Sequence, residues 1–224
     1  MKRTIKLLYL LSIASLISCS TKDLMKYYYP TLDTSTSKVY KYINSADSTL
    51  NEYWKVTYNH KDKTLTTESF RSDLTLYNKF EEEIVMNSAE LSRYTDYKNG
   101  KEIYSTVNKT AVYSDNNKTE YSYSVAYTNK WGRFNFEKVR RFEALENITI
   151  KGITYKTAKF KDKYFTKAID QNVEYDFNQT TYYAKDIGMV KYERFIPTGE
   201  VRILELDSII SVEAFDERRM KVGR

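Results

Sequence analysis

The run EYSYSVAY, residues 120–127, decides the fold of this chain. Its large side chains stand at every second position, as Tyr121, Tyr123, Val125 and Tyr127. A period of two is the pattern of a half-buried β-strand, because successive side chains of a strand point to opposite faces. Trp54, Val56 and Tyr58 repeat the pattern in a second run. We therefore expect one face of each strand to be packed.

Turn-forming residues separate these alternating runs. The turn segments are His60–Lys63, Asn99-Gly100, Asp115–Lys118, Lys151-Gly152, Asp186–Gly188 and Pro197–Gly199. The predicted strands between them cover residues 38–43, 51–59, 64–70, 73–86, 89–98, 102–113, 119–128, 133–142, 147–151, 153–162, 173–184, 189–196 and 200–207. Short strands at this spacing predict an antiparallel meander. The expected fold is all-β and mainly antiparallel: one strongly curved meander sheet or open barrel, with few or no helices in the mature domain.

Residues 77–94 fit two local structures. Phe80, Ile84, Leu91 and Tyr94 would share one face of a helix. Phe80 and Ile84 also alternate with acidic neighbours, as in a strand. Since strands are predicted on both sides, we prefer a hairpin that turns near Asn87-Ser88.

The N-terminus has the layout of a secretory leader. Lys2, Arg3 and Lys6 precede an apolar run over residues 7–17. As a helix that run covers about 17 Å, which is too short for a hydrocarbon core of about 30 Å. The residues Leu16-Ile17-Ser18-Cys19 resemble the lipobox of bacterial lipoproteins. This resemblance implies cleavage before Cys19 and acylation of that cysteine, so that the mature protein is anchored in a lipid bilayer.

These features divide the chain into four parts. We expect a lipoprotein signal peptide over residues 1–18, then the acylated Cys19 and a short tether to residue 26, a single β domain over residues 27–212, and a charged C-terminal tail over residues 213–224 that forms a short helix or frays. No other cysteine remains to form a disulfide, so the domain must be held by packing alone. The tether of seven residues reaches at most about 25 Å.

Charge and residue types exclude several functions. Removing the three leader cations lowers the formal net charge from +6 to +3, which is not the signature of a nucleic-acid partner. His60 is the only histidine and falls at a predicted turn, so the sequence indicates no catalytic triad, no metal site and no cofactor. We expect a protein that is not an enzyme. A carboxylate-based hydrolase stays open, with Glu81, Glu83, Glu137 and Asp176 available.

Three segments carry a family resemblance. Residues 28–42 contain Tyr28-Tyr29-Pro30 and Val39–Tyr42, residues 148–155 read ITIKGITY, and residues 182–191 read YYAKDIGMVK. They resemble uncharacterised secreted lipoproteins common in Bacteroidota, in which the last motif usually has glycine where Asp186 stands. More remotely, such proteins are similar to the curved-sheet carriers of the lipoprotein-localisation (LolA/LolB-like) type. The resemblance implies a concave sheet face that holds acyl chains.

We therefore expect a non-enzymatic, membrane-anchored lipoprotein of the cell envelope, with the outer membrane as the preferred location. Its expected partner, besides the bilayer at Cys19, is a lipid or an envelope protein bound on a curved sheet. The candidate ligand-binding residues are Trp54, Val56, Tyr58, Tyr121, Tyr123, Val125 and Tyr127. An alternative is that the sheet closes and these residues are simply core. A second alternative is a surface carbohydrate-binding module that uses exposed tyrosines.

Overall fold

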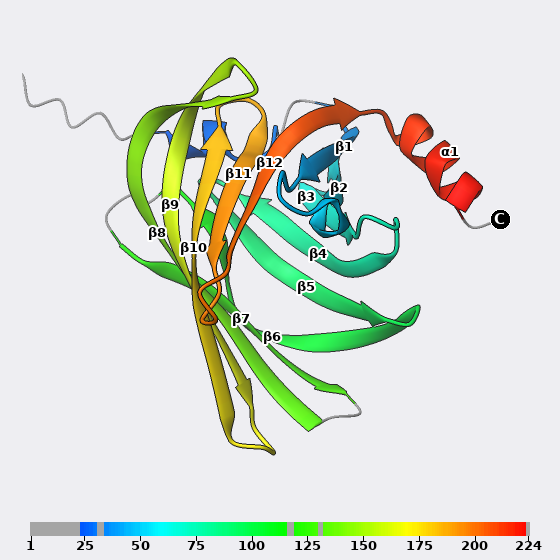
Figure 1. The fold of residues 1–224 in the computed structure, drawn as a ribbon. Coiled ribbons are helices and arrows are strands. Elements are labelled where there is room, and N and C mark those ends of the chain that lie inside the picture. Colours follow the sequence, from blue (N-terminus) through cyan, green and yellow to red (C-terminus); the bar gives the residue numbers. More distant parts are fainter. Residues whose placement is uncertain (1–22, 31–33, 116–118, 130–131, 223–224) are drawn as a thin grey trace, which may run out of the picture.

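Twelve antiparallel strands form a closed barrel in the computed structural model (Figure 1). The structure describes residues 23–222 except 31–33, 116–118 and 130–131. The strands are β1 (Thr36–Ile43), β2 (Glu52–Asn59), β3 (Thr64–Phe70), β4 (Leu76–Val85), β5 (Ser88–Lys98), β6 (Lys101–Ser114), β7 (Tyr121–Asn129), β8 (Gly132–Ile150), β9 (Ile153–Ala168), β10 (Val173–Ala184), β11 (Gly188–Phe195) and β12 (Val201–Ile210). The prediction of an all-β antiparallel fold is confirmed.

The meander closes because its first and last strands pair. β1 lies antiparallel to β12, with Val39 opposite Ile210 and Ile43 opposite Glu205. Every other strand pairs with its neighbours in the sequence. Closure leaves no free sheet edge between β1 and β12, which removes a site where another chain could add a strand.

Residues 77–94 form the predicted hairpin, not a helix. β4 and β5 pair antiparallel across a turn at Met86-Asn87, and Met86 adopts a positive φ of 43°. Two of the predicted strands, 133–142 and 147–151, are one strand, β8, because a bulge between Phe142 and Ala144 continues the pairing with β9. β9 also extends to Ala168, beyond the predicted end at residue 162, since its last residues pair with both β8 and β10.

One end of the barrel is closed by residues 24–29, which we call the plug segment. It begins with a 3-10 helix, η1 (Leu24–Tyr27), and places Leu24, Tyr28 and Tyr29 in the barrel core. The Tyr113 hydroxyl donates to the Leu24 carbonyl at 2.8 Å, and the Asp186 amide donates to the Lys26 carbonyl at 2.8 Å. Leu24, which the expected tether includes, is therefore part of the packed core.

The turn between β10 and β11 shows how Asp186 replaces the glycine of the related motif. Asp186 takes a left-handed conformation with φ of 61°, which aspartate tolerates better than most residues. Gly188 follows with φ of 106°, and a Cβ atom there would lie 2.4 Å from the Tyr29 ring. The absence of a side chain at Gly188 thus leaves room for Tyr29 of the plug segment.

The C-terminal tail forms one helix on the outside of the barrel, α1 (Val212–Val222) (Figure 1). Phe215 is fully buried and packs against Val39 and Phe70, with ring centroids of Phe215 and Phe70 5.0 Å apart. In the part of the chain that the structure describes, no helix is long and apolar enough to cross a membrane.

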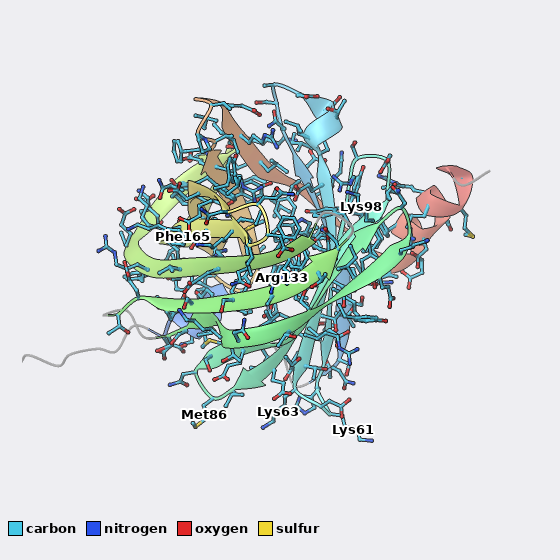
Figure 2. All side chains as sticks on the ribbon, turned by 90° about the horizontal axis from the view of Figure 1, so that it is seen from below. Lys61, Lys63, Met86, Lys98, Arg133 and Phe165 are labelled. Carbon is cyan, nitrogen blue, oxygen red and sulfur yellow. The ribbon has the colours of Figure 1, made fainter. Side chains whose placement is uncertain are left out.

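The turns gather at two ends of the barrel. The turn after β2 and the turn after β4 lie at the end with the plug segment, where the Ile84 amide donates to the Lys63 carbonyl at 2.8 Å. Figure 2 shows Lys61, Lys63 and Met86 from these turns together at one edge of the molecule, away from Lys98 and Arg133. The latter two come from strand ends at the opposite, open end of the barrel.

Candidate functional site: the barrel cavity

The barrel encloses a cavity of about 610 Å³ between the plug segment and the open end. Tyr28 and Tyr29 of the plug segment line its floor. At the other end it is lined by Thr49, Arg71 and Asp73, whose side chains are exposed, so the cavity reaches solvent there. A volume between about 300 and 1,000 Å³ is typical of sites for small ligands.

A row of rings crosses the cavity wall, and we call it the aromatic belt. Each ring lies within 6.0 Å of a neighbouring one, measured between centroids. Its members, one from each of six strands, are Phe80, Tyr94, Tyr123, Phe136, Tyr164 and Phe177. All six line the cavity. They project inward because each stands at an inward position of a strand whose side chains alternate between the two faces. The belt offers ring faces and edges to an apolar or aromatic group.

A buried ion cluster lies deeper in the barrel. Arg140 on β8 donates from Nε and Nη2 to the two carboxylate oxygens of Asp162 on β9, at 2.7 and 2.9 Å. Lys138 Nζ lies 3.1 Å from the same carboxylate, and the Thr181 hydroxyl donates to it at 2.6 Å. Although burial opposes ionisation, the Arg140 and Lys138 charges hold the pKa of Asp162 well below its usual range. Burial and the charge of Arg140 lower the pKa of Lys138.

Glu82 connects the cavity to the plug segment. The Tyr28 hydroxyl donates to Glu82 Oε2 at 2.6 Å, and both residues are buried. Burial raises the pKa of Glu82 to about 7, against the opposing effect of the Tyr28 hydrogen bond and the Arg140 charge. The Glu82 carboxyl is therefore only partly ionised at neutral pH.

A second polar group lies nearer the open end. Glu52 accepts hydrogen bonds from Trp54 Nε1 at 2.8 Å and from the Tyr192 hydroxyl at 3.2 Å. Burial raises the pKa of the Glu52 carboxyl, while the charge of Arg194 opposes that rise. Arg194 lines the cavity beside Phe177, with its guanidinium carbon 5.1 Å from the ring centroid. The cavity wall thus combines charged, hydrogen-bonding and apolar side chains.

The seven predicted binding residues all lie on inner faces of β2 and β7, but only two line this cavity. These two are Trp54 on β2 and Tyr123 on β7, and the two strands are far apart in the order of the barrel. Val56 and Tyr58 are buried in the core beside the plug segment, and Val125 is buried in a second core cluster. The other two, Tyr121 and Tyr127, are half-buried. Tyr127 stacks on Phe134 with centroids 5.3 Å apart.

The acidic residues that left a hydrolase open do not converge in the cavity. Glu81 forms an ion pair with Lys79 at 2.5 Å on the outer face, and Glu137 pairs with Lys109 there. Glu83 and Asp176 are exposed. Cys19, the predicted lipidation site, lies outside the described residues.

The charged residues of the interior were not predicted from the sequence: Glu52, Glu82, Lys138, Arg140, Asp162 and Arg194. A signal for them was present. Lys138 and Arg140 share their parity with Phe136 and Phe142 along β8, so the alternation that places the phenylalanines inside also places the cations there.

Tyrosines contribute mainly to the interior. Twelve of them are buried, whereas Tyr104 and Tyr175 are among the exposed large side chains. Tyr175 lines a second hollow of about 410 Å³, together with Phe165, which Figure 2 shows on the side of the barrel. The surface available for a carbohydrate-binding module based on exposed tyrosines is therefore small.

Comparisons with known proteins give similarity of fold. An exported protein with a YmcC-like fold from Bacteroides fragilis matches with a TM-score of 0.52 and 12% identity, over 82% of this chain and 99% of that chain. A lipoprotein from Parabacteroides distasonis matches with a TM-score of 0.47 and 13% identity, over 82% and 95%. The hypothetical lipoprotein YmcC of Escherichia coli matches with a TM-score of 0.37 and 9% identity, over 81% and 89%.

No family model matches the chain. No curated protein matches it significantly either. At 12% identity the likeness to the Bacteroides fragilis protein shows the YmcC-like fold alone. The remote similarity to lipoprotein-localisation carriers stays a prediction.

Proposed function

We propose that this chain of YmcC-like fold is a lipid-anchored lipoprotein of the cell envelope, whose barrel binds a small ligand without transforming it. The observation that carries the proposal is the cavity of about 610 Å³, which the plug segment closes at one end and solvent reaches at the other. A barrel interior filled by side chains would be enough for a stable core. Folding therefore does not require this open volume.

The leader and the residues Leu16–Cys19 support the anchor. The description of the Bacteroides fragilis protein of similar fold as exported agrees with a place in the envelope. An acylated cysteine carries two or three acyl chains, which is sufficient for stable attachment, whereas one chain binds only marginally. Mass analysis of the N-terminus of protein isolated from membranes tests this part. A mature chain that begins at Cys19 and carries fatty acids is expected; an intact leader or an unmodified thiol would refute the anchor.

The ligand-binding part has a separate test. Chain from residue 19 onward with Cys19→Ser retains every described residue, and we expect native mass spectrometry of this protein to show a bound small molecule after mild purification. Leu50→Trp is the matched variant, because Leu50 lines the cavity near the open end and a larger side chain there narrows the entrance. Loss of the bound mass in this variant is expected. Failure to find any adduct, together with failure of small-molecule probes to bind, would rule out the carrier function.

A further inference from the structure

Among the described residues, Arg194 is a cation in the interior of the cavity without a carboxylate in contact. Its Nε donates to Gln179 Oε1 at 3.0 Å, and its guanidinium carbon lies 5.1 Å from the ring centroids of both Phe177 and Tyr192. Within the described part of the chain, its two terminal nitrogens make no hydrogen bond and no carboxylate lies within 4.0 Å of it. Four N–H donors of this side chain are therefore available to a ligand.

Arg140, the other interior arginine, has a carboxylate partner. Arg140 is paired with both oxygens of Asp162 and also donates to the Tyr183 hydroxyl at 3.2 Å. A guanidinium withdrawn from bulk water without a partner is costly, so buried arginines are usually paired. Arg194 has rings around it and a single amide oxygen, which fix its position without neutralising it.

The other charged groups of the cavity determine the electrostatic surroundings of Arg194. Three cations, Lys138, Arg140 and Arg194, face the carboxyls of Asp162, Glu82 and Glu52. Burial raises the pKa of Glu82 to about 7 and raises the pKa of Glu52, and it lowers the pKa of Lys138. Within the described residues, Lys138 and Arg140 share the carboxylate of Asp162, whereas Arg194 has no carboxylate in contact. At the open end the exposed charges of Arg71 and Asp73 are opposite and offset each other.

We propose that the ligand of the cavity is a small amphipathic organic anion, whose acidic group binds the free face of the Arg194 guanidinium and whose ring or short acyl chain lies against the aromatic belt. A planar guanidinium matches a carboxylate, phosphate or sulfonate through two parallel hydrogen bonds. Phe177 and Tyr164, which are stacked 4.5 Å apart, connect Arg194 directly to the belt. This inference rests on the proposed ligand-binding function and names the ligand class.

Two dyes with nearly the same ring system test the inference. 8-Anilinonaphthalene-1-sulfonate carries a sulfonate, and N-phenyl-1-naphthylamine lacks it. We expect fluorescence titration of the Cys19→Ser protein to give clearly tighter binding of the anionic dye. Arg194→Met keeps much of the side-chain volume and removes the charge. It should weaken binding of the anionic dye about tenfold or more, since the hydrogen bonds between the guanidinium and the sulfonate are lost, and change binding of the neutral dye less than about twofold.

Further variants separate the outcomes. Arg194→Lys keeps the charge but not the fork, and should recover only part of the affinity. Arg141→Met is the control on the exposed outer face of β8 and should leave both dyes unchanged. Leu50→Trp should weaken both dyes if they occupy the cavity. Equal loss of both dyes in Arg194→Met would overturn the anion site and leave the carrier function standing. Absence of cavity-dependent binding of either dye would overturn the carrier function itself.

Discussion

At the scale of single residues, the interior of this barrel is defined by charges that sit where apolar side chains are usual. Asp162 is the centre of this arrangement, because one carboxylate serves both Arg140 and Lys138. Removing one partner of a buried ion pair costs more than the pair itself contributes, since the remaining charge stays buried and unpaired. The two cations therefore depend on Asp162 for their place in the core.

Asp162→Asn is expected to destabilise the protein by about 3–5 kcal/mol at pH 7, as measured by urea unfolding. Because the pKa of Asp162 is depressed in the folded state, its contribution is present above the ordinary value near 3.8 and is lost as the pH falls below it. The deficit of the variant should accordingly shrink in acid. Asp176→Asn, on the exposed surface, is the control and should stay within about 0.5 kcal/mol of the wild type. A small, pH-independent effect of Asp162→Asn would contradict the role assigned here.

Glu82 predicts the opposite pH dependence. Its pKa is about 7 in the folded state against an ordinary value of 4.5, so its contribution to stability is complete below pH 4.5 and is lost as the pH rises through 7. The total is about 3 kcal/mol, from about 1.4 kcal/mol per pKa unit. Glu82→Gln still accepts the Tyr28 hydrogen bond but cannot ionise. It should remove this slope between pH 5 and 8, whereas Glu83→Gln on the exposed face should keep it. Parallel stability curves for wild type and Glu82→Gln would refute the assignment.

The sequence predicted which large apolar and aromatic side chains point into the barrel, but it did not predict the buried charged ones. Tyr123 and Trp54 were expected inside because large side chains at alternate positions mark a buried face. Arg194 and Glu82 were not, since a charge at such a position is as compatible with an outward face until the register of the neighbouring strands is known. Asp162, which neutralises the buried charge of Arg140, lies on the neighbouring strand β9. This ion pair cannot be inferred from a single sequence.

At the scale of elements, the turn between β10 and β11 and the plug segment depend on each other. The Asp186 amide binds the Lys26 carbonyl, and Gly188 leaves the space that the Tyr29 ring fills. The strands themselves were predictable from alternation and turn residues, including the β4–β5 hairpin. The burial of Leu24 was not, because nothing local in residues 20–26 marks the segment as part of a core.

Gly188→Ala tests this dependence. Gly188 and Gly152 both have positive φ, 106° and 81°, but a Cβ at Gly152 meets no atom within 4 Å. Gly152→Ala should cost about 1–2 kcal/mol from backbone strain alone. Gly188→Ala should cost at least about 1 kcal/mol more, because its Cβ overlaps the Tyr29 ring. In a Tyr29→Leu background the extra cost should disappear. Equal losses for the two glycine variants in thermal or urea unfolding would show that the ring adapts freely.

At the scale of the whole molecule, closure joins the two ends of the sequence. The pairing of β1 with β12 brings Ile43 opposite Glu205, with most of the domain between them. The entropic cost of bringing these distant residues together is offset only after the intervening strands are ordered. Closure was one of two alternatives from the sequence, since turn patterns define neighbouring strands and contain no information on whether the first meets the last.

A disulfide between β1 and β12 tests how large the entropic cost of closing the barrel is. In the Cys19→Ser background, a disulfide between Ile43→Cys and Glu205→Cys encloses most of the domain, and one between Lys55→Cys and Glu68→Cys encloses a single hairpin. Chain entropy predicts stabilisation by about 5 and about 3 kcal/mol, respectively. Comparison of oxidised and reduced protein by urea unfolding measures both. A closure cross-link that stabilises no more than the hairpin cross-link would indicate that the unfolded chain already keeps its ends together.

Under the proposed lipid anchor, the burial of Leu24 limits how far the plugged end can lie from a bilayer. Only residues 20–23 separate it from Cys19, and five extended steps of about 3.5 Å span about 17 Å. If Cys19 is acylated as proposed, the plugged end would lie near the headgroups, and the entrance lined by Arg71 and Asp73 would face the aqueous compartment. Under the proposed function, a ligand would then enter and leave through water. Exchange with the supporting leaflet would require the plug segment to be withdrawn first.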